Sequence, residues 1–199
     1  MKIVPLAFFN RPTLAVAREL LGCHLAFRQD NQVRRFIITE TEAYDGFDDL
    51  ASHARRGKTQ RNEIMFREAG HLYVYFTYGI HWLLNIVTGP AGYPAAVLIR
   101  GARPADDSIH YNGPAKLTKA LGITGAFNGL ILSRQAGLWI EGPKLDQPKP
   151  TIITSPRIGI DYAGPIWSQV HYRFVLEGKE EKRTKQKVER TKTKVEIRK

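Results

Sequence analysis

Two predicted strands carry the side chains that are able to do chemistry. The first, residues 35–44, places Glu40, Glu42 and Tyr44 at alternate positions, so two carboxylates and a phenol share one face. Carboxylates are costly to bury without a use, which favours an acid/base role for this face. The alternative is a solvated outer face on which Glu40 and Glu42 pair with nearby arginines.

The second strand, residues 72–79, brings aromatic rings that could hold a flat substrate. Tyr73, Tyr75 and Tyr78 follow one another along it, and it ends at Gly79, where a tyrosine at the turn can project outward. Ordinary packing of each tyrosine is the alternative. The residues that alternate with the tyrosines are expected to face the core: Leu72, Val74 and Phe76.

A strongly basic loop lies between these two strands. Four of its cations fall within seven residues: Arg55, Arg56, Lys58 and Arg61. Arginine binds phosphate in a bidentate manner, so the loop predicts contacts with a phosphate backbone, the alternative being an exposed loop of unpaired charges. The start of a predicted helix, residues 112–122, with Gly113 and Lys116, is a second candidate anion site, or simply a capped structural helix.

The charge of the chain points to a polyanionic partner, although not evenly along its length. The 199 residues carry 30 Lys+Arg against 19 Asp+Glu, a formal net charge of +11. Residues 179–199 hold ten Lys/Arg and four Glu, so +6 of the +11 belongs to this tail. Nucleic acid is the first candidate partner and an anionic membrane surface the second. We expect the tail to be disordered and either to add non-specific nucleic-acid affinity or to act as a solubilising extension.

Several classes of protein are excluded by what the chain lacks. Cys23 is the only cysteine, which excludes an intrachain disulfide, a thiolate metal cluster and the ligand set of a zinc deaminase. No apolar run approaches the roughly 18 residues of a membrane span. The apolar start is interrupted at residues 10–12, so we expect no signal peptide. The expected location is cytoplasmic, or nuclear in a eukaryote, and not secreted.

The remaining pattern is that of one domain built on a sheet. A helix is predicted for residues 12–21, capped by Asn10, and another for 112–122, capped by Asn112. Strands are predicted at residues 23–27, 33–44, 72–79, 82–87, 95–100, 137–142, 155–162 and 172–176. We therefore expect a single α+β domain, residues 1–177, with a curved, mostly antiparallel sheet flanked by short helices and followed by the tail, residues 178–199.

The order and spacing of many short motifs resemble the alkyladenine (3-methyladenine) DNA glycosylase family. The motifs are Glu40-Thr-Glu-Ala-Tyr44, His53, Arg61-Asn62, Leu72-Tyr-Val-Tyr75, Tyr78-Gly79, Asn85-Ile86, Val97-Leu-Ile-Arg100, Asn112-Gly-Pro-Ala-Lys-Leu117 and Arg157-Ile-Gly-Ile160. The resemblance covers about residues 10 to 177 and not the tail. It rests on the motifs together, since none of them is specific alone.

The resemblance implies a monofunctional enzyme of base excision repair. Such an enzyme flips a damaged purine out of the duplex and hydrolyses its N-glycosidic bond. The implied substrates are alkylated or deaminated purines in double-stranded DNA: 3-methyladenine, 7-methylguanine, hypoxanthine and ethenoadenine. We expect a monomer that needs no metal and no organic cofactor and that binds no membrane.

The same resemblance assigns roles to individual residues by position. Glu42 is similar to the general base that activates water, and Arg100 to the residue that helps to hold that water. Tyr78 resembles the wedge that enters the duplex, and Asn85 the gate that clashes with the 2-amino group of guanine. The remaining matches are to the rings that stack on the flipped base: Tyr44, His53 and Tyr75. The DNA backbone is expected to contact Arg55, Lys58, Arg61, Gly113 and Lys116.

The sequence departs from the family pattern at two positions and leaves other functions open. Gln60 stands where a proline is usual, and Arg103 where an acidic residue is common, so DNA contacts or substrate range could differ. A non-catalytic nucleic-acid-binding protein that keeps the base pocket is the main alternative, and the retained Glu42 argues against it. A bifunctional lyase is not expected, because no lysine aligns with a nucleophile.

Overall fold

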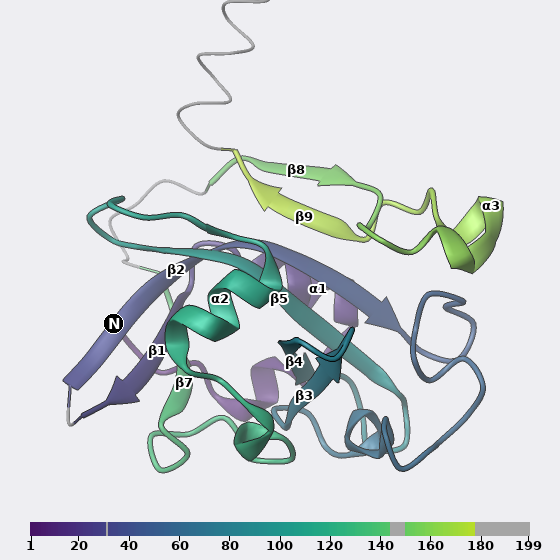
Figure 1. The fold of residues 1–199 in the computed structure, drawn as a ribbon, viewed down its shortest axis with the longest axis horizontal. Coiled ribbons are helices and arrows are strands. Elements are labelled where there is room, and N and C mark those ends of the chain that lie inside the picture. Colours follow the sequence, from purple (N-terminus) through teal and green to yellow (C-terminus); the bar gives the residue numbers. More distant parts are fainter. Residues whose placement is uncertain (31, 144–149, 178–199) are drawn as a thin grey trace, which may run out of the picture.

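The protein was analysed as a computed structural model that describes residues 1–30, 32–143 and 150–177 (Figure 1). Within these ranges nine strands form one sheet in which every pair is antiparallel. The strands are β1 (His24–Gln29), β2 (Gln32–Asp45), β3 (Leu72–Thr77), β4 (His81–Val87), β5 (Ala95–Pro104), β6 (Tyr111–Asn112), β7 (Leu138–Glu141), β8 (Ile152–Ser155) and β9 (Arg173–Leu176).

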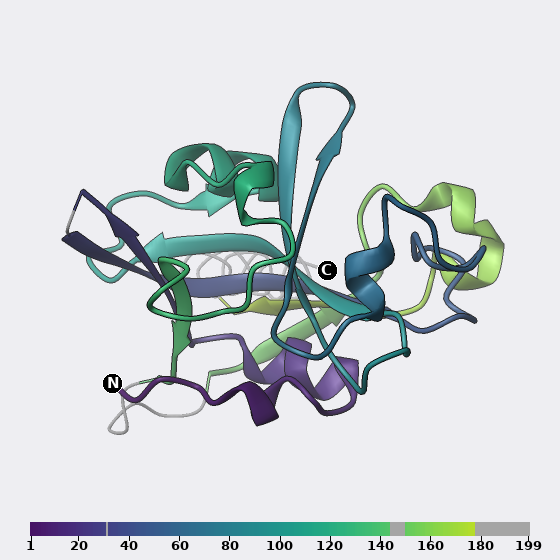
Figure 2. The ribbon, with the colours of Figure 1, turned by 90° about the horizontal axis from the view of Figure 1, so that it is seen from below.

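In the described part of the chain, three short α-helices accompany the sheet, which confirms the predicted α+β class. They are α1 (Thr13–Glu19), α2 (Pro114–Leu121) and α3 (Gly164–Trp167). Four 3-10 helices span Leu6–Phe8, Glu63–Phe66, Gly125–Phe127 and Asp161–Ala163. Figure 2 shows α1 and α2 on opposite sides of the sheet, so apolar residues on both of its faces are covered. None of the helices described is long and apolar enough to cross a membrane.

Strand β2 is the centre of the fold and carries the first group of candidate residues. The strand order is β3-β4-β5-β2-β1-β7, and β9 also pairs with β2 and joins β8 to the sheet. The predicted hairpin of β1 and β2 is confirmed. On one face of β2 the Thr41 hydroxyl donates to Ala17 O of α1 at 2.8 Å, while Glu40 and Glu42 on the other face both contact Arg100. The alternation read from the sequence therefore holds along this part of β2.

Both predicted helix caps are wrong. Pro12, not Asn10, is at the N-cap of α1 and provides no side-chain cap. Asn112 lies in strand β6 opposite Gly101, and Gly113 occupies the N-cap of α2 with φ of 116°. This backbone conformation favours glycine over asparagine, and the following proline has the φ that a first helical turn needs.

The hairpin of β3 and β4 extends away from the rest of the sheet (Figure 2). Tyr78 and Gly79 have φ of 51° and 68° at its tip, and Ile80 N donates to Thr77 O, so both central residues of the turn have the positive φ of a type I′ turn. The prediction that Phe76 faces the core is wrong, since it is 44% exposed. Phe76 packs across the strands on Trp82, with ring centroids 4.7 Å apart.

The predicted strand at residues 155–162 is also wrong. Strand β8 ends at Ser155, before Pro156, and Gly159 follows with φ of 74°. A proline and a left-handed glycine interrupt strand pairing, so this segment forms a loop and a 3-10 helix instead. The predictions for residues 178–199 lie outside the described residues.

Cys23 lies directly before strand β1. Its side chain is buried and the thiol donates to Glu19 O at 3.3 Å. Burial, aided by the nearby Glu19 carboxylate, raises the pKa of Cys23 to about 11. The thiol is therefore protonated at neutral pH and unreactive.

Candidate active site

An aromatic pocket opens beside the point where the β3–β4 hairpin leaves the sheet. Its empty volume is about 330 Å³, including the open space at its mouth. Strands β2 to β5, the loop after β2 and the segment after β8 all contribute side chains. The lining residues are Tyr44, Ala51, His53, Met65, Tyr73, Tyr75, Asn85, Ala96 and Tyr162. Four residues predicted to contact a flat base thus lie together: Tyr44, His53, Tyr75 and Asn85.

The rings on one side of the pocket support one another. His53 and Tyr75 pack edge to face with centroids 4.6 Å apart, and Tyr73 lies 5.1 Å from Tyr75. The Nδ1 atom of His53 and the Tyr73 hydroxyl are 3.0 Å apart in a hydrogen bond. The three rings form a firm wall, which suits stacking on a planar ligand.

His53 lies at the pocket mouth, where its ring is partly exposed to solvent. Loss of hydration where the ring packs against its neighbours, together with the positive charges of Arg61 and Arg55, lowers the pKa of His53 to about 4. Solvent at the open edge moderates this effect, but the imidazole is neutral at pH 7 in either case. A neutral ring does not repel a positively charged base.

Glu42 is fully buried beside Tyr44, which overturns the alternative of a solvated outer face. Its Oε1 accepts a hydrogen bond from Ile158 N at 2.8 Å. Its Oε2 accepts longer bonds from the Tyr44 hydroxyl at 3.0 Å and from Arg100 Nη1 at 3.4 Å. Tyr44 lines the pocket whereas Glu42 is not among the lining residues, so the carboxylate lies directly behind the pocket wall.

Burial is the largest influence on the pKa of Glu42 and raises it above the usual value. Arg100, the Ile158 N–H and the Tyr44 hydroxyl lower it in turn, and the charge of Glu40 raises it. The balance is a raised pKa, so this carboxyl group loses its proton at a higher pH than an ordinary glutamate does. A raised carboxyl pKa brings a general base closer to its working pH.

Arg100 is held in place by a second carboxylate. Its Nε donates to Glu40 Oε1 at 2.9 Å, and Arg173 Nε of β9 donates to the same oxygen at 2.6 Å. Glu40 thus pairs with arginines, as the alternative interpretation of this strand face predicted. Its side chain is, however, nearly buried and not solvated. This arrangement fixes the guanidinium of Arg100 next to Glu42.

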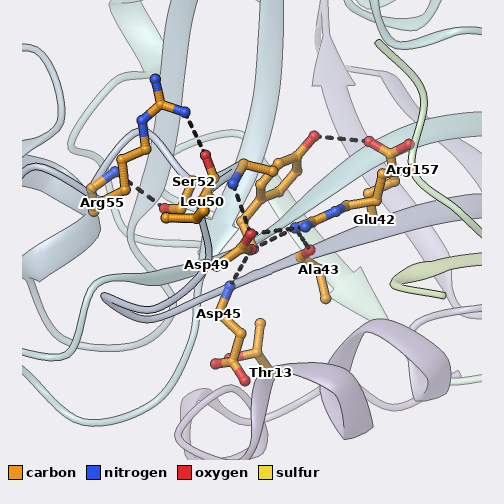
Figure 3. Close-up of polar contacts among 12 residues, drawn as sticks. Thr13, Glu42, Ala43, Asp45, Asp49, Leu50, Ser52, Arg55 and Arg157 are labelled. Atoms are coloured by element: carbon orange, nitrogen blue, oxygen red, sulfur yellow. Dashed lines mark hydrogen bonds and ion pairs between the residues drawn. The ribbon is translucent and has the colours of Figure 1, made fainter. Parts of the chain in front are cut away.

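Arg157 and Asp49 form a buried ion pair that was not among the predicted site residues (Figure 3). Arg157 Nη2 donates to Asp49 Oδ1 at 2.8 Å, and Nη1 donates to both Asp49 Oδ2 and Ala43 O. The guanidinium lies 4.8 Å from the ring centroid of Tyr44. The partners are 108 residues apart in sequence, so no local pattern could have indicated the pair.

Two tyrosines of the pocket were also missed as site residues. Tyr73 follows the same alternation as Tyr75, so that pattern was available as a signal. Tyr162 comes from the segment after β8, its hydroxyl donates to Ala51 O at 2.9 Å, and no local pattern marked it. Burial raises the pKa of Tyr73 to about 12, so its hydroxyl stays protonated beside His53.

The predicted DNA-contacting residues lie outside the pocket. Arg61 lies over the ring of Tyr75 at 5.6 Å, Arg55 lies over that of Tyr162 at 5.2 Å, and Lys58 is exposed in the same loop. Tyr78 is 88% exposed at the hairpin tip.

The predicted anion site at the start of α2 is only partly open to a ligand. Lys116 is exposed on the first turn of the helix. The N–H of Gly113 already donates to Arg100 O at 3.0 Å and is therefore used within the protein. A phosphate at this helix start would have to be bound by other groups.

Comparison with protein-family models decides the family of this protein. The model described as methylpurine-DNA glycosylase matches residues 7–180. The chain belongs to the methylpurine-DNA glycosylase family. As a member of this family it is a DNA glycosylase, an enzyme of DNA repair that hydrolyses N-glycosyl bonds of bases flipped out of DNA.

Curated relatives of this glycosylase cover most of its length. A protein of Anaeromyxobacter dehalogenans strain 2CP-C is 45% identical over 177 residues, which cover 88% of this chain and 84% of the relative. One from Myxococcus xanthus is 43% identical over 87% of this chain and 90% of the relative. One from Methanocella arvoryzae is 42% identical over 82% and 88%. Each is named "Putative 3-methyladenine DNA glycosylase".

Proposed function

We propose that this glycosylase excises alkylated and deaminated purines from double-stranded DNA, with a water molecule activated by Glu42. The observation that carries the proposal is the buried carboxylate of Glu42, hydrogen-bonded by three donors directly behind an aromatic pocket. The names of the relatives support 3-methyladenine as one substrate. The proposed catalytic unit is residues 1–177, acting as a monomer without metal or organic cofactor.

The pocket suits alkylated and deaminated purines for different reasons. A purine alkylated on a ring nitrogen carries positive charge, which is attracted to the electron-rich faces of Tyr44 and Tyr75. Its glycosidic bond is already weak, so modest catalysis releases it. Hypoxanthine and ethenoadenine are neutral, and their release depends more on activation of the water and on a proton that reaches the leaving base.

The hydrolytic water is proposed to bind at Oε2 of Glu42. Oε1 is held by the short bond from Ile158 N, whereas both bonds to Oε2 are longer and come from the side of Tyr44 and Arg100. Entry of a base against Tyr44 brings the water next to Oε2, where Glu42 accepts a proton and Arg100 orients the water oxygen.

Asn85 is proposed to reject normal guanine. The residue lines the pocket, and its Nδ2 donates to Tyr73 O at 3.0 Å, so the amide cannot easily turn aside. Replacement of Asn85 with serine should leave room for a 2-amino group and raise guanine release relative to hypoxanthine release about tenfold. Parallel single-turnover assays on two duplexes that differ only in hypoxanthine or guanine measure this ratio. A ratio equal to that of the wild-type enzyme would rule out the gate.

DNA is proposed to lie across the hairpin tip and the basic loop. Tyr78 would fill the space that the flipped base leaves. Phosphates would contact Arg55, Lys58 and Arg61 beside the pocket, with Lys116 at the start of α2 as a further contact. The exposure of Tyr78 and the cations that flank the pocket support this placement.

The function is tested by single-turnover excision from duplexes that carry one damaged base. We expect release of 3-methyladenine or ethenoadenine and of hypoxanthine, and no release from the same duplex without the lesion. Gel separation after alkaline cleavage of abasic sites gives the rate for each substrate. Tight lesion binding without any release would contradict the proposal and support a binding protein that keeps the base pocket.

A further inference from the structure

The buried ion pair of Asp49 and Arg157 lies next to the proposed general base but does not touch the pocket. Both side chains are fully buried. Asp49 also accepts hydrogen bonds from Asp45 N at 3.1 Å and from Ala51 N at 3.0 Å. Two buried charges are costly to desolvate, and donors at both carboxylate oxygens of Asp49 offset part of this cost, whereas Arg157 Nε is buried without a hydrogen-bond partner among the described residues.

This ion pair joins three segments that surround the pocket (Figure 3). Asp49 belongs to the loop after β2, Arg157 to the segment after β8, and the carbonyl group of Ala43, which accepts from Arg157 Nη1 at 2.8 Å, to β2 itself. A second link between the outer segments is the hydrogen bond from the Tyr162 hydroxyl to Ala51 O. The ion pair therefore sets how the segment after β8 lies against β2.

The residue that follows Arg157 makes the shortest hydrogen bond to Glu42. Ile158 N donates to Glu42 Oε1 at 2.8 Å, while the Ile158 side chain is half exposed. The contribution of Ile158 to the site is thus its backbone N–H and not its side chain. The position of this N–H depends on the fork of hydrogen bonds that holds the adjacent arginine.

We propose that Arg157, anchored by Asp49, is a positioning residue that holds the Ile158 N–H on Glu42 and supports the rear of the Tyr44 ring. In this role it keeps Glu42 ionised and leaves Oε2 for the water. The inference rests on the proposed role of Glu42 as the general base. Arg157 itself touches neither the base nor the water.

The charge on Glu42 is set by groups from every element around it. Glu40 and Tyr44 come from β2 and Tyr75 from β3. Arg100 comes from β5, and Arg173 lies opposite Glu42 in the register of β9. Arg157 and the Ile158 N–H complete the set. Of these groups, the Ile158 N–H makes the shortest contact, so its loss should favour the protonated carboxyl group.

Replacement of Arg157 with lysine tests the proposal because it keeps the charge and removes the fork. The wild-type excision rate for hypoxanthine should rise with pH as Glu42 loses its proton. In the variant, the midpoint of this rise should move upward by roughly one to two pH units, because a hydrogen bond to the ionised form is lost. The rate at pH 7 should fall about 10-fold or more, while binding of lesion DNA is retained.

The matched control removes an ion pair remote from Glu42 in which the carboxylate is buried and the arginine is exposed. Glu141 is 2% exposed and accepts from Arg35 Nε at 2.7 Å and from Trp139 Nε1 at 2.9 Å, on β7 and β2. Glu141→Gln should lower the melting temperature without moving the pH midpoint. If Arg157→Lys also lowers only the melting temperature and leaves the midpoint unchanged, the pair is merely structural and the proposal is overturned.

A second variant keeps the proposal testable if Arg157→Lys does not fold. Ile158→Pro leaves the Asp49–Arg157 pair in place but removes the N–H that donates to Glu42. The same upward movement of the pH midpoint is expected, and an unchanged midpoint would overturn the proposal. Glu42→Gln, assayed alongside, separates a failure of the proposed role of Glu42 from a failure of the proposed role of Arg157. If this variant turns over like the wild-type enzyme, the proposed function of Glu42 fails, whatever Arg157 does.

Discussion

Replacement of Glu42 with glutamine should reduce the single-turnover excision of hypoxanthine by about 10³-fold or more. Glutamine has nearly the same shape and can still accept the Ile158 N–H bond, so the pocket keeps its form, but the amide cannot take a proton from water. Lesion-duplex affinity should therefore stay within about threefold of wild type, since binding does not need the base. The loss should be smaller for 3-methyladenine, whose bond is weak without activation of the water.

The neighbouring carboxylate provides the matched control for this experiment. Glu40→Gln removes a buried negative charge from the same strand face but leaves Glu42 with its three donors. Its effect passes through Arg100 and Arg173 and through the loss of the Glu40 charge near Glu42, so we expect a loss of about 10-fold at most. Wild-type turnover by Glu42→Gln, or an equal loss in the two variants, would end the assignment of Glu42 as the base.

Truncation of Tyr78 to alanine should weaken lesion binding and slow excision about 10- to 100-fold. Flipping a base costs a few kcal/mol, and a ring stacked in the vacated space recovers about 1–3 kcal/mol of it. Tyr78 is 88% exposed and its φ is 51°, so the side chain already projects from the tip in the free protein. The measurements are the dissociation constants for lesion and plain duplexes and the single-turnover rate.

Tyr78→Phe separates the ring from the hydroxyl group. If the ring fills the space by stacking, phenylalanine should restore binding and rate to within about threefold of wild type. Alanine should lower the preference for lesion DNA over plain duplex without lowering the melting temperature, because an exposed side chain contributes little to the core. An unchanged preference in Tyr78→Ala would remove the wedge role.

The sheet could be predicted because its signals are local. Alternation along β2 placed Glu40 and Glu42 on the face that contacts Arg100, and Gly122, with φ of 65°, ends α2 where the predicted helix 112–122 ends. Side chains alternate between the two faces of any strand, and this alternation does not depend on which strands pair with it. The same reasoning failed at Phe76, because alternation does not say where a hairpin leaves the sheet and loses the cover on its apolar face.

The site could be predicted only where one strand carried several of its residues. Tyr44 and Glu42 were found together on β2, whereas Arg157 and Tyr162 come from a segment more than a hundred residues later that was itself expected to be a strand. Their contribution depends on tertiary contacts across the sheet. Arg157 was noticed only as part of the motif Arg157-Ile-Gly-Ile160, and no local pattern showed that it is buried against Asp49.

Because Cys23 is unreactive, the hairpin tip can be labelled selectively with a fluorescent dye. Because the only thiol of the chain is buried and protonated at neutral pH, a cysteine introduced at Ile80, which is 68% exposed beside Tyr78, would be the one site that reacts quickly with a maleimide dye. The wild-type background needs no cysteine removal for such labelling. Stopped-flow traces from the labelled enzyme would then record insertion into the duplex separately from bond cleavage.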